Sequence, residues 1–339
     1  MRAQITAIVL LINILFPPAI LAGGLPVKGH IPLEEAFITF QDNQQEIFLR
    51  INLLSEVSDA TVIFPVPAPV EIDMVSDDIL FTYLAEATQP QIQVEERLVW
   101  INSPQPNHND EANSHFGTFN GELVENYQID QFTASEPDAL QQWIEEHEYY
   151  LPTRAYSILQ TYADQGWSFV TITLQEDRPI DSTLQSIRLT FETEAIVYPM
   201  MLSSLVNQPF DIALYVLTDN RVDISSLETQ YASPVDQLNP PPPDEIAAYF
   251  TASFLTKLGA SQIAPTSITS DFVVQPSATN ESFKQTIFQT NEVSGWERMS
   301  GPILGVAAVV AMNALVIGFA LGLSYHMRRL AGPEPEDSE

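Results

Sequence analysis

Two histidines with acidic residues between them are the first residues of this chain whose types and spacing could do chemistry. His108 and His115 flank Asp110 and Glu111 in a polar stretch. Imidazole nitrogens and carboxylate oxygens bind metals, but this spacing matches no recognised zinc or calcium motif. Polar clusters between periodic segments are usually exposed loops, so we expect a loop here and no metal site.

Other catalytic patterns are missing from the sequence. There is no nucleophile elbow, phosphate-binding loop, dinucleotide glycine pattern or paired-histidine zinc helix. The chain also has no cysteine, which excludes disulfides, a thiol nucleophile and thiolate metal ligands. We therefore expect no cofactor. An acid/base pair could still form among the carboxylates, because sequence alone does not show which two approach each other.

The charge balance restricts the classes of partner. The chain has 13 Lys and Arg against 44 Asp and Glu, which gives a formal net charge of −31. Such a field repels nucleic acid and attracts cations or a basic partner protein. The alternative is an acidic surface that serves solubility or a salty habitat, because net charge says more about solubility than about fold.

The sequence predicts several helices that pack an apolar face against the core. Apolar residues recur at helical spacing after Asp138, at Leu140, Trp143 and Ile144, and His147 ends the stripe. We interpret His147 as a packed residue or a partner of the helix C-terminus rather than a catalytic base, since no second catalytic group sits at a recognisable spacing. Further helices are predicted over residues 76–88 and 153–164, and from Asp244 to Leu258.

Strands account for most of the remaining apolar segments. A hairpin is predicted over residues 36–54, with its turn at Asp42 and Asn43. The alternating prolines Pro65, Pro67 and Pro69 lack backbone donors, which predicts polyproline II or a sheet edge. Other strands are expected at 94–101, 167–174, 187–191 and 212–217, with a short β-like piece at 283–288.

In this arrangement the chain resembles a family. The segments that carry the resemblance occur in order: Phe64–Pro69, Asp138–Trp143, Tyr150–Pro152, Gly166–Val170, Leu189–Phe191, Tyr198–Met200 and Leu214–Asp219. Over residues 30–225 they are similar to the bacterial domain of unknown function 2330. The resemblance implies an exported bacterial protein, often membrane-anchored, and no activity. Family members often carry cysteines after the signal peptide, where this chain has Gly23, Gly24 and Leu25.

A charge-free run near the C-terminus predicts a membrane span. It extends from Ile303 to Tyr325 and measures about 34 Å at about 1.5 Å per residue. Arg328 and Arg329 follow it and place the C-terminus in the cytoplasm. Small residues form a stripe along the run that could pack two such helices into a homodimer: Ala307, Ala311, Ala314, Gly318 and Gly322.

These features together predict a domain order. Residues 1–22 read as a signal peptide, although an uncleaved first span is the alternative. An extracytoplasmic region follows over 23–275, as one large or two small domains, then a membrane-proximal stalk over 276–302. The span at 303–325 and a short cytoplasmic tail at 326–339 complete the chain.

The expected fold class is α+β, a mainly antiparallel sheet ectodomain with several packed helices and one C-terminal transmembrane helix. The expected location is the plasma membrane, as a single-pass protein with its N-terminal domain outside. We expect a non-enzymatic envelope module that binds a partner protein, polymer or cations. The alternative is an extracytoplasmic carboxylate-dependent hydrolase, which a pocket with two converging carboxylates, one with a raised pKa, would favour.

Overall fold

The computed structural model describes residues 25–294 with gaps at 28, 68, 76–78, 100–121, 125–126 and 135–137, together with Val310, Met312 and Leu315. The chain divides into two compact units. The first consists of Met1–Gln91 and Asn113–Thr286, and the second of Ile92–Ala112 and Ile287–Glu339. Within the described residues the first unit holds the two large sheets and all the helices discussed below.

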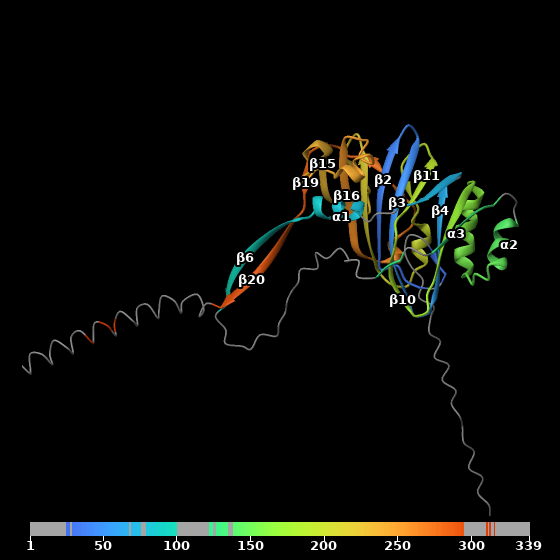
Figure 1. The fold of residues 1–339 in the computed structure, drawn as a ribbon, viewed down its shortest axis with the longest axis horizontal. Coiled ribbons are helices and arrows are strands. Elements are labelled where there is room, and N and C mark those ends of the chain that lie inside the picture. The colour runs from blue at the N-terminus through green and yellow to red at the C-terminus, as the bar shows by residue number, and fades with distance from the viewer. Residues whose placement is uncertain are drawn as a thin grey trace, which may run out of the picture. The chain divides into compact units, whose positions relative to one another are not determined.

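A ten-stranded sheet forms the centre of the first unit (Figure 1). Its main path runs through β19 (Phe283–Lys284), β15 (Glu228–Pro234), β16 (Phe254–Ile263), β13 (Phe210–Thr218), β2 (Leu33–Gln41), β3 (Gln44–Ser55), β10 (Ile180–Leu184) and β7 (Glu122–Val124). Two further strands extend it beside β3, namely β11 (Ile187–Glu192) and β5 (Val70–Met74). Most neighbours are antiparallel, but β13 runs parallel to β2.

The β2–β3 hairpin fixes the register at the middle of this sheet. Asp42 and Asn43 form its turn with φ angles of 52° and 62°, a left-handed conformation that Asp and Asn tolerate better than most residues. Gln41 pairs with Gln44 across the turn. The hairpin predicted from these residues is therefore confirmed.

A four-stranded sheet packs against the large one. Its order is β1 (Leu25–Pro26), β4 (Asp59–Pro67), β9 (Trp167–Gln175) and β8 (Gln128–Thr133). β4 pairs with β9 along its whole length but with β1 only at Val62 and Ile63. Among the described residues, the proline half of β4 thus has a strand on one side only, which confirms the predicted sheet edge.

The two sheets and the helices on their outer faces form four layers, with apolar side chains packed between them. Ile38 and Leu49 of the large sheet meet Val62 and Val170 of the small one in the central core. The other faces are covered by helices. Alternate strand residues point to opposite faces, so strands buried on both sides read as nearly continuous apolar runs.

Two pairs of helices form the outer layers. α2 (Ala139–Glu146) and α3 (Thr153–Asp164) cover the small sheet, with Trp143 and Tyr162 packed near Phe169. α1 (Ile79–Ala87) and the short α4 (Asp244–Ala247) cover the far face of the large sheet. The predicted helices over 76–88 and 153–164 and the helix after Asp138 are confirmed within the described residues.

The helix predicted from Asp244 to Leu258 is wrong beyond its first turn. α4 ends at Ala247, and Phe254–Ile263 is the strand β16. Leu255 faces the core under α1, while Leu258 faces the core between the sheets. A strand buried on both faces gives a short apolar run that periodicity cannot distinguish from a helix.

Short elements join these layers at one end of the first unit. They are β12 (Val197–Tyr198), η1 (Met201–Leu205), β14 (Val222–Asp223), η2 (Val235–Gln237), η3 (Pro265–Ser267), β17 (Phe272–Val273) and β18 (Gln275–Pro276). β12 pairs with β17, and β14 pairs with β18. These two small ladders hold the segment 265–276 against the rest of the unit.

The prediction of an α+β fold with a transmembrane helix is wrong. The structure is mostly β-sheet, with 48 % strand and 20 % helix, and its described residues include four α-helices. Strand content exceeds the expectation because β8, β10 and β15 were not predicted and β16 was predicted as a helix.

The membrane prediction is also corrected. No helix in the described part of the chain is long and apolar enough to cross a membrane. The longest, α3, has 12 residues and measures about 18 Å, short of a hydrocarbon core of about 30 Å. The finding contradicts the expected single-pass plasma-membrane location with a cytoplasmic C-terminus, the integral membrane partner and the transmembrane homodimer. Apart from Val310, Met312 and Leu315, the predicted span at 303–325 lies outside the described residues.

The second unit contains most of a two-stranded ribbon. It pairs β6 (Gln91–Val99) with β20 (Thr286–Ser294). Ile92, Val94 and Phe288 are exposed on it. A strand near 94–101 and a β-like piece beginning at 283 were both expected from the sequence, and both are present.

Candidate functional site

A cavity lined by hydroxyl groups is the best candidate for a functional site in the described structure. Its volume is about 300 Å³, within the range of small-ligand sites. We call it the hydroxyl pocket, after the five side chains that border it: Ser225, Ser226, Ser267, Thr269 and Ser270. Ile224, Ile268 and Phe272 line it as well and are buried, so they form an apolar floor.

The pocket is assembled from two stretches that are distant in sequence. Ile224, Ser225 and Ser226 follow β14, and the other lining residues lie between Ile263, the last residue of β16, and Gln275 of β18. Gln262 has a φ of 54°, and its backbone N–H donates to the Asp211 carboxylate at 2.8 Å. This contact holds the turn that leads from β16 into η3.

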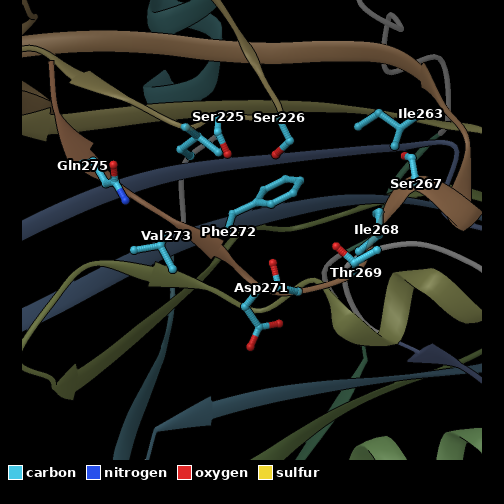
Figure 2. A pocket seen from close by; sticks show the side chains of 12 residues that line it. Ser225, Ser226, Ile263, Ser267, Ile268, Thr269, Asp271, Phe272, Val273 and Gln275 are labelled. Atoms are coloured by element: carbon cyan, nitrogen blue, oxygen red, sulfur yellow. The ribbon is translucent and has the colours of Figure 1, made fainter. Parts of the chain in front are cut away.

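Asp271 lies at the base of the pocket and has a structural role. Its Oδ1 accepts hydrogen bonds from the Tyr162 hydroxyl at 2.5 Å and from the backbone N–H groups of Met200 and Met201 at 2.7 and 2.9 Å. In Figure 2 its carboxylate points to the opposite side of the strand from the Phe272 ring. Asp271 therefore ties the pocket segment to η1 and α3.

The Tyr162 hydroxyl remains protonated in this arrangement. Burial and the neighbouring Asp271 carboxylate both raise the pKa of Tyr162 far above its ordinary value. The phenol is a hydrogen-bond donor to the carboxylate, and the aspartate is committed to that contact. The Tyr162 phenol therefore cannot act as a general acid or base near neutral pH.

The pocket lining carries little charge. Among its twelve residues there is no Lys, Arg or His, and Asp271 is the one carboxylate. The remaining polar groups are hydroxyls and the Gln275 amide, each able to donate and to accept. The site can therefore form hydrogen bonds with a ligand but offers it no cationic partner.

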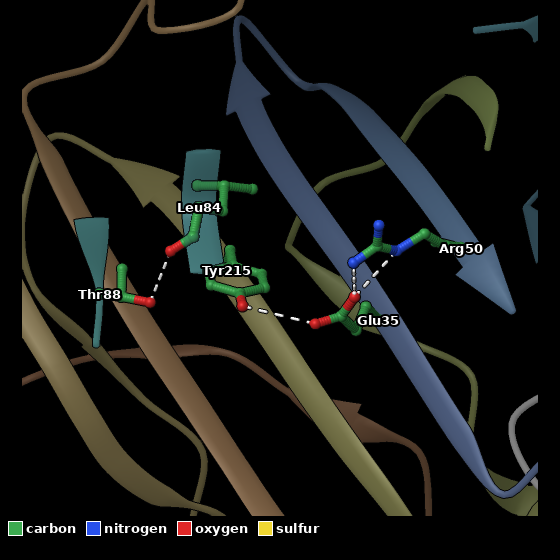
Figure 3. A network of polar contacts seen from close by, with 5 residues as sticks. All are labelled: Glu35, Arg50, Leu84, Thr88 and Tyr215. Carbon is green, nitrogen blue, oxygen red and sulfur yellow. Dashed lines mark hydrogen bonds and ion pairs between the residues drawn. The ribbon is translucent and has the colours of Figure 1, made fainter. Parts of the chain in front are cut away.

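A second polar region lies beneath α1, on the opposite face of the large sheet from the central core (Figure 3). We call it the buried ionic cluster: Glu35 of β2, Arg50 of β3, Tyr215 of β13 and Lys257 of β16. The Arg50 guanidinium donates from Nε to Glu35 Oε2 at 2.9 Å and from Nη2 to the same oxygen. The Tyr215 hydroxyl donates to Glu35 Oε1 at 3.5 Å.

The aromatic and titratable neighbours complete this cluster. Arg50 lies 4.6 Å from the Phe81 ring centroid, and the Lys257 ammonium 5.1 Å from that of Tyr215. Burial lowers the pKa of Lys257, and the Glu35 charge opposes this effect. Burial and Glu35 raise the pKa of Tyr215 well above its ordinary value. Each charge here is balanced by another protein group.

Glu34 is the neighbour of Glu35 in sequence but faces the core between the sheets. It is fully buried and accepts a hydrogen bond from the Tyr198 hydroxyl through Oε1, while its Oε2 has no hydrogen-bond partner among the described residues. Burial raises its pKa to about 7, and the Tyr198 hydrogen bond partly opposes that rise. Glu34 and Glu35 cannot converge on one substrate, since adjacent strand residues point to opposite faces.

Another cavity of about 430 Å³ lies beside α1. Its walls come from Ile79, Tyr83 and the prolines Pro240, Pro241 and Pro243, with Thr82 and Glu86 at the helix. The Tyr83 hydroxyl donates to the Pro240 carbonyl at 2.9 Å and so connects the two walls. Few polar groups converge on it, and neither Glu34 nor Glu35 lines it.

Comparison with known proteins identifies the family. A model for an uncharacterised protein conserved in bacteria, DUF2330, matches residues 30–275. The chain belongs to the DUF2330 family. The match extends beyond residue 225, where the sequence resemblance ended, and includes every residue that lines the hydroxyl pocket.

Similarity to other proteins is weak. The crystal structure of baculovirus P35 matches with a TM-score of 0.37 and 10% sequence identity, over 76% of this chain and 96% of that chain. At this TM-score the two do not share a demonstrated fold. No protein with a curated description matches the chain.

Most residues singled out in the DUF2330 sequence lie outside the described structure. These are His108 and His115, the small-residue stripe Ala307, Ala311, Ala314, Gly318 and Gly322, and the flanking Arg328 and Arg329. The predicted signal peptide at 1–22 lies outside it too. Among the described residues no group of three or more His, Asp or Glu side chains is placed to hold a metal ion.

His147 is the one singled-out histidine that the structure describes. Its Nδ1 lies 2.8 Å from the Trp143 carbonyl, and its ring contacts those of Trp143 and Tyr149. His147 is exposed and lies at the C-cap of α2, so of the two interpretations the structure supports a partner of the helix C-terminus and not a packed residue. Sequence reasoning missed the hydroxyl pocket, although the paired hydroxyl residues Ser225–Ser226 and Thr269–Ser270 are visible in the sequence.

Proposed function

We propose that this DUF2330 protein is a non-enzymatic binding module that holds a small ligand in the hydroxyl pocket and releases it unchanged. The observation that carries the proposal is the pocket itself, in which five exposed hydroxyl side chains stand over a buried apolar floor. Ligand sites typically combine an apolar lining with a few polar groups that fix orientation. The described lining provides both.

The carboxylates of the described structure favour binding over hydrolysis. A carboxylate-dependent hydrolase needs two acids that converge on a pocket, with one pKa raised toward neutrality. Glu34 has such a pKa, but it is fully buried and lines neither cavity described above. Asp271 lines the hydroxyl pocket, but its Oδ1 already accepts three hydrogen bonds.

The proposal can be tested by NMR on the full chain with labelled isoleucine methyl groups. Ile224, Ile263 and Ile268 line the pocket, whereas Ile47 lies in the central core and serves as an internal reference. We expect mixtures of small uncharged organic fragments to shift the three pocket methyl signals and leave that of Ile47 in place. Absence of selective shifts at the three pocket signals contradicts the proposal.

A pocket-filling variant makes the test specific. Ser226→Trp places a large ring in the pocket and should abolish the shifts, while Ser157→Trp on the exposed face of α3 should leave them unchanged. Equal shifts in both variants would assign binding to another surface. Conversion of any bound ester or glycoside fragment to product, lost in Ser226→Trp, would support the hydrolase alternative instead.

A further inference from the structure

The chemistry of the hydroxyl pocket restricts the class of ligand further than its volume does. Ser225, Ser226, Thr269 and Ser270 make no side-chain hydrogen bond to another described residue, and Ser267 donates to the Ala264 carbonyl at 2.7 Å. A hydroxyl is both a donor and an acceptor. The pocket thus presents several groups that can exchange hydrogen bonds in either direction with a ligand that is itself rich in hydroxyls.

Electrostatics disfavours a charged ligand. An anion would find no Lys, Arg or His in the lining and would approach a chain of net charge −31. A cation would find one carboxylate, Asp271, which points away from the Phe272 ring and holds η1 and α3 (Figure 2). A neutral ligand avoids both costs.

The floor of the pocket adds an apolar requirement. Phe272 is 6% exposed and lies at the centre of the lining, with Ser225 and Ser226 on one side of its ring and Ser267 and Thr269 on another (Figure 2). Ile268 also lines the cavity, near Ser267 and Thr269 (Figure 2). A ligand that fits must therefore present an apolar face to the floor and polar groups to the rim.

We infer that the hydroxyl pocket binds a neutral sugar ring, as a free hexose or as one unit of a neutral saccharide. A pyranose ring carries hydroxyls around its edge and C–H groups on its faces, which matches the rim and the floor. The cavity of about 300 Å³ is at the lower end of the range for small-ligand sites and suits one ring rather than an extended chain. This inference rests on the proposed function and names its ligand class.

The inference is tested with a matched set of sugars on the full chain. Methyl glycosides of glucose, galactose and mannose are titrated while the methyl signals of Ile224, Ile263 and Ile268 are followed. At least one neutral glycoside should shift these signals with an affinity at least tenfold higher than those of glucuronic acid, glucosamine and the open-chain polyol sorbitol. Binding of a charged sugar or of sorbitol with equal or higher affinity overturns the inference.

Alanine substitutions locate the sugar within the pocket. Ser226→Ala and Thr269→Ala, on two sides of the floor, should each weaken binding of the selected glycoside about fivefold, the effect of losing one neutral hydrogen bond. Ser157→Ala, on exposed α3, should leave the affinity unchanged. Unchanged affinity in both pocket variants places the sugar elsewhere and refutes the assignment.

The two proposals fail in different ways. If uncharged fragments shift the pocket methyl signals but no neutral glycoside does, the sugar assignment is wrong and the binding module stands. If neither fragments nor glycosides shift them, the proposed function fails, and the sugar inference with it.

Discussion

The buried ionic cluster and the hydroxyl pocket are both rich in polar groups, but those groups are buried and paired in the cluster and exposed in the pocket. Beneath α1, Glu35 accepts from Arg50 and Tyr215, and its charge acts on Lys257. In the hydroxyl pocket, side chains such as Ser226 and Thr269 face solvent. In the buried ionic cluster the polar groups bond to other protein groups and stabilise the fold, whereas in the hydroxyl pocket they are exposed and available to a ligand.

The contrast follows from the elements that supply the residues. The ionic cluster sits on four adjacent strands of the large sheet, where side chains are fixed by the ladder and covered by a helix. The pocket is built from loops and two-residue strands at the sheet ends. Loops held by a rigid scaffold are where binding residues concentrate. The ionic cluster has the higher density of charged groups, but those groups are bonded to one another, so charge density alone does not identify the candidate site.

The largest effect should come from breaking the ionic cluster. Glu35→Leu leaves Arg50 and Lys257 buried without their carboxylate, and we expect the free energy of unfolding to fall by about 3–5 kcal/mol. Urea denaturation followed by circular dichroism measures this loss. Adding Arg50→Met to Glu35→Leu should recover part of it, because one uncompensated buried charge is removed.

An exposed ion pair provides the control for that prediction. Arg188 meets Asp73 at 2.6 Å on the surface, where solvent screens the charges. Asp73→Asn should change the free energy of unfolding by no more than about 1 kcal/mol. If Asp73→Asn and Glu35→Leu have similar effects, the ionic cluster is not the buried, interdependent unit described here.

The next largest effect should be a pH dependence caused by Glu34. Its pKa is raised from 4.5 to about 7 in the folded chain, so between these values the folded state keeps a proton that the unfolded state has lost. The stabilisation is complete below pH 4.5 and is lost as the pH rises through about 7. The shift corresponds to about 3 kcal/mol.

Variants of Glu34 and Tyr198 separate the contribution of Glu34 to the pH dependence of stability from the contributions of the other carboxylates. Thermal melts of the parent and of Glu34→Gln between pH 4 and 9 should diverge, because the glutamine cannot ionise. Tyr198→Phe removes the hydrogen bond that lowers the pKa of Glu34, so the loss of stability should move to higher pH. Parallel pH profiles for the parent and Glu34→Gln would contradict the raised pKa.

Asp271 should give an intermediate effect, because it lines the hydroxyl pocket but is hydrogen-bonded to other protein groups, as the residues of the ionic cluster are. Asp271→Ala removes the acceptor for the Tyr162 hydroxyl and for two backbone N–H groups at η1, and should cost about 2 kcal/mol in urea denaturation. Asp271→Asn retains an acceptor oxygen and should cost less. If the alanine variant is as stable as the parent, Asp271 does not anchor the pocket. The Asp271 carboxylate of the parent would then be available to a ligand.

The smallest effect on stability should come from the pocket hydroxyls. Ser226→Ala and Thr269→Ala each remove an exposed group that makes no side-chain hydrogen bond to another described residue. The free energy of unfolding should change by no more than about 0.5 kcal/mol. A loss of several kcal/mol would mean that the pocket rim is structural, and the contrast with the ionic cluster would disappear.

The sequence predicted individual elements better than their assembly. Asp42 and Asn43 revealed the β2–β3 turn because few residues accept a left-handed conformation, and the apolar spacing within 153–164 revealed α3. β16 was read as a helix because both of its faces are buried. Residues Phe254–Leu258 are all buried, including the polar Thr256 and Lys257, so apolar and polar residues do not alternate along it.

The pocket could not be predicted, because its residues are brought together only by tertiary pairing. Ser226 and Thr269 are far apart in sequence, and the two-residue ladder β14–β18 that joins their segments is too short to leave a pattern. The opposite settings of Glu34 and Glu35 follow from strand alternation once β2 is known. Their different partners depend on which helices and sheets cover each face.

A crystal structure of the full chain soaked with the uncharged fragment or glycoside that gives the largest methyl shifts tests the central claim most directly. The account predicts density for that compound over Phe272, with hydroxyl oxygens of Ser226 or Thr269 within hydrogen-bond distance. Density in the cavity between α1 and Pro241, with the hydroxyl pocket empty, would contradict it.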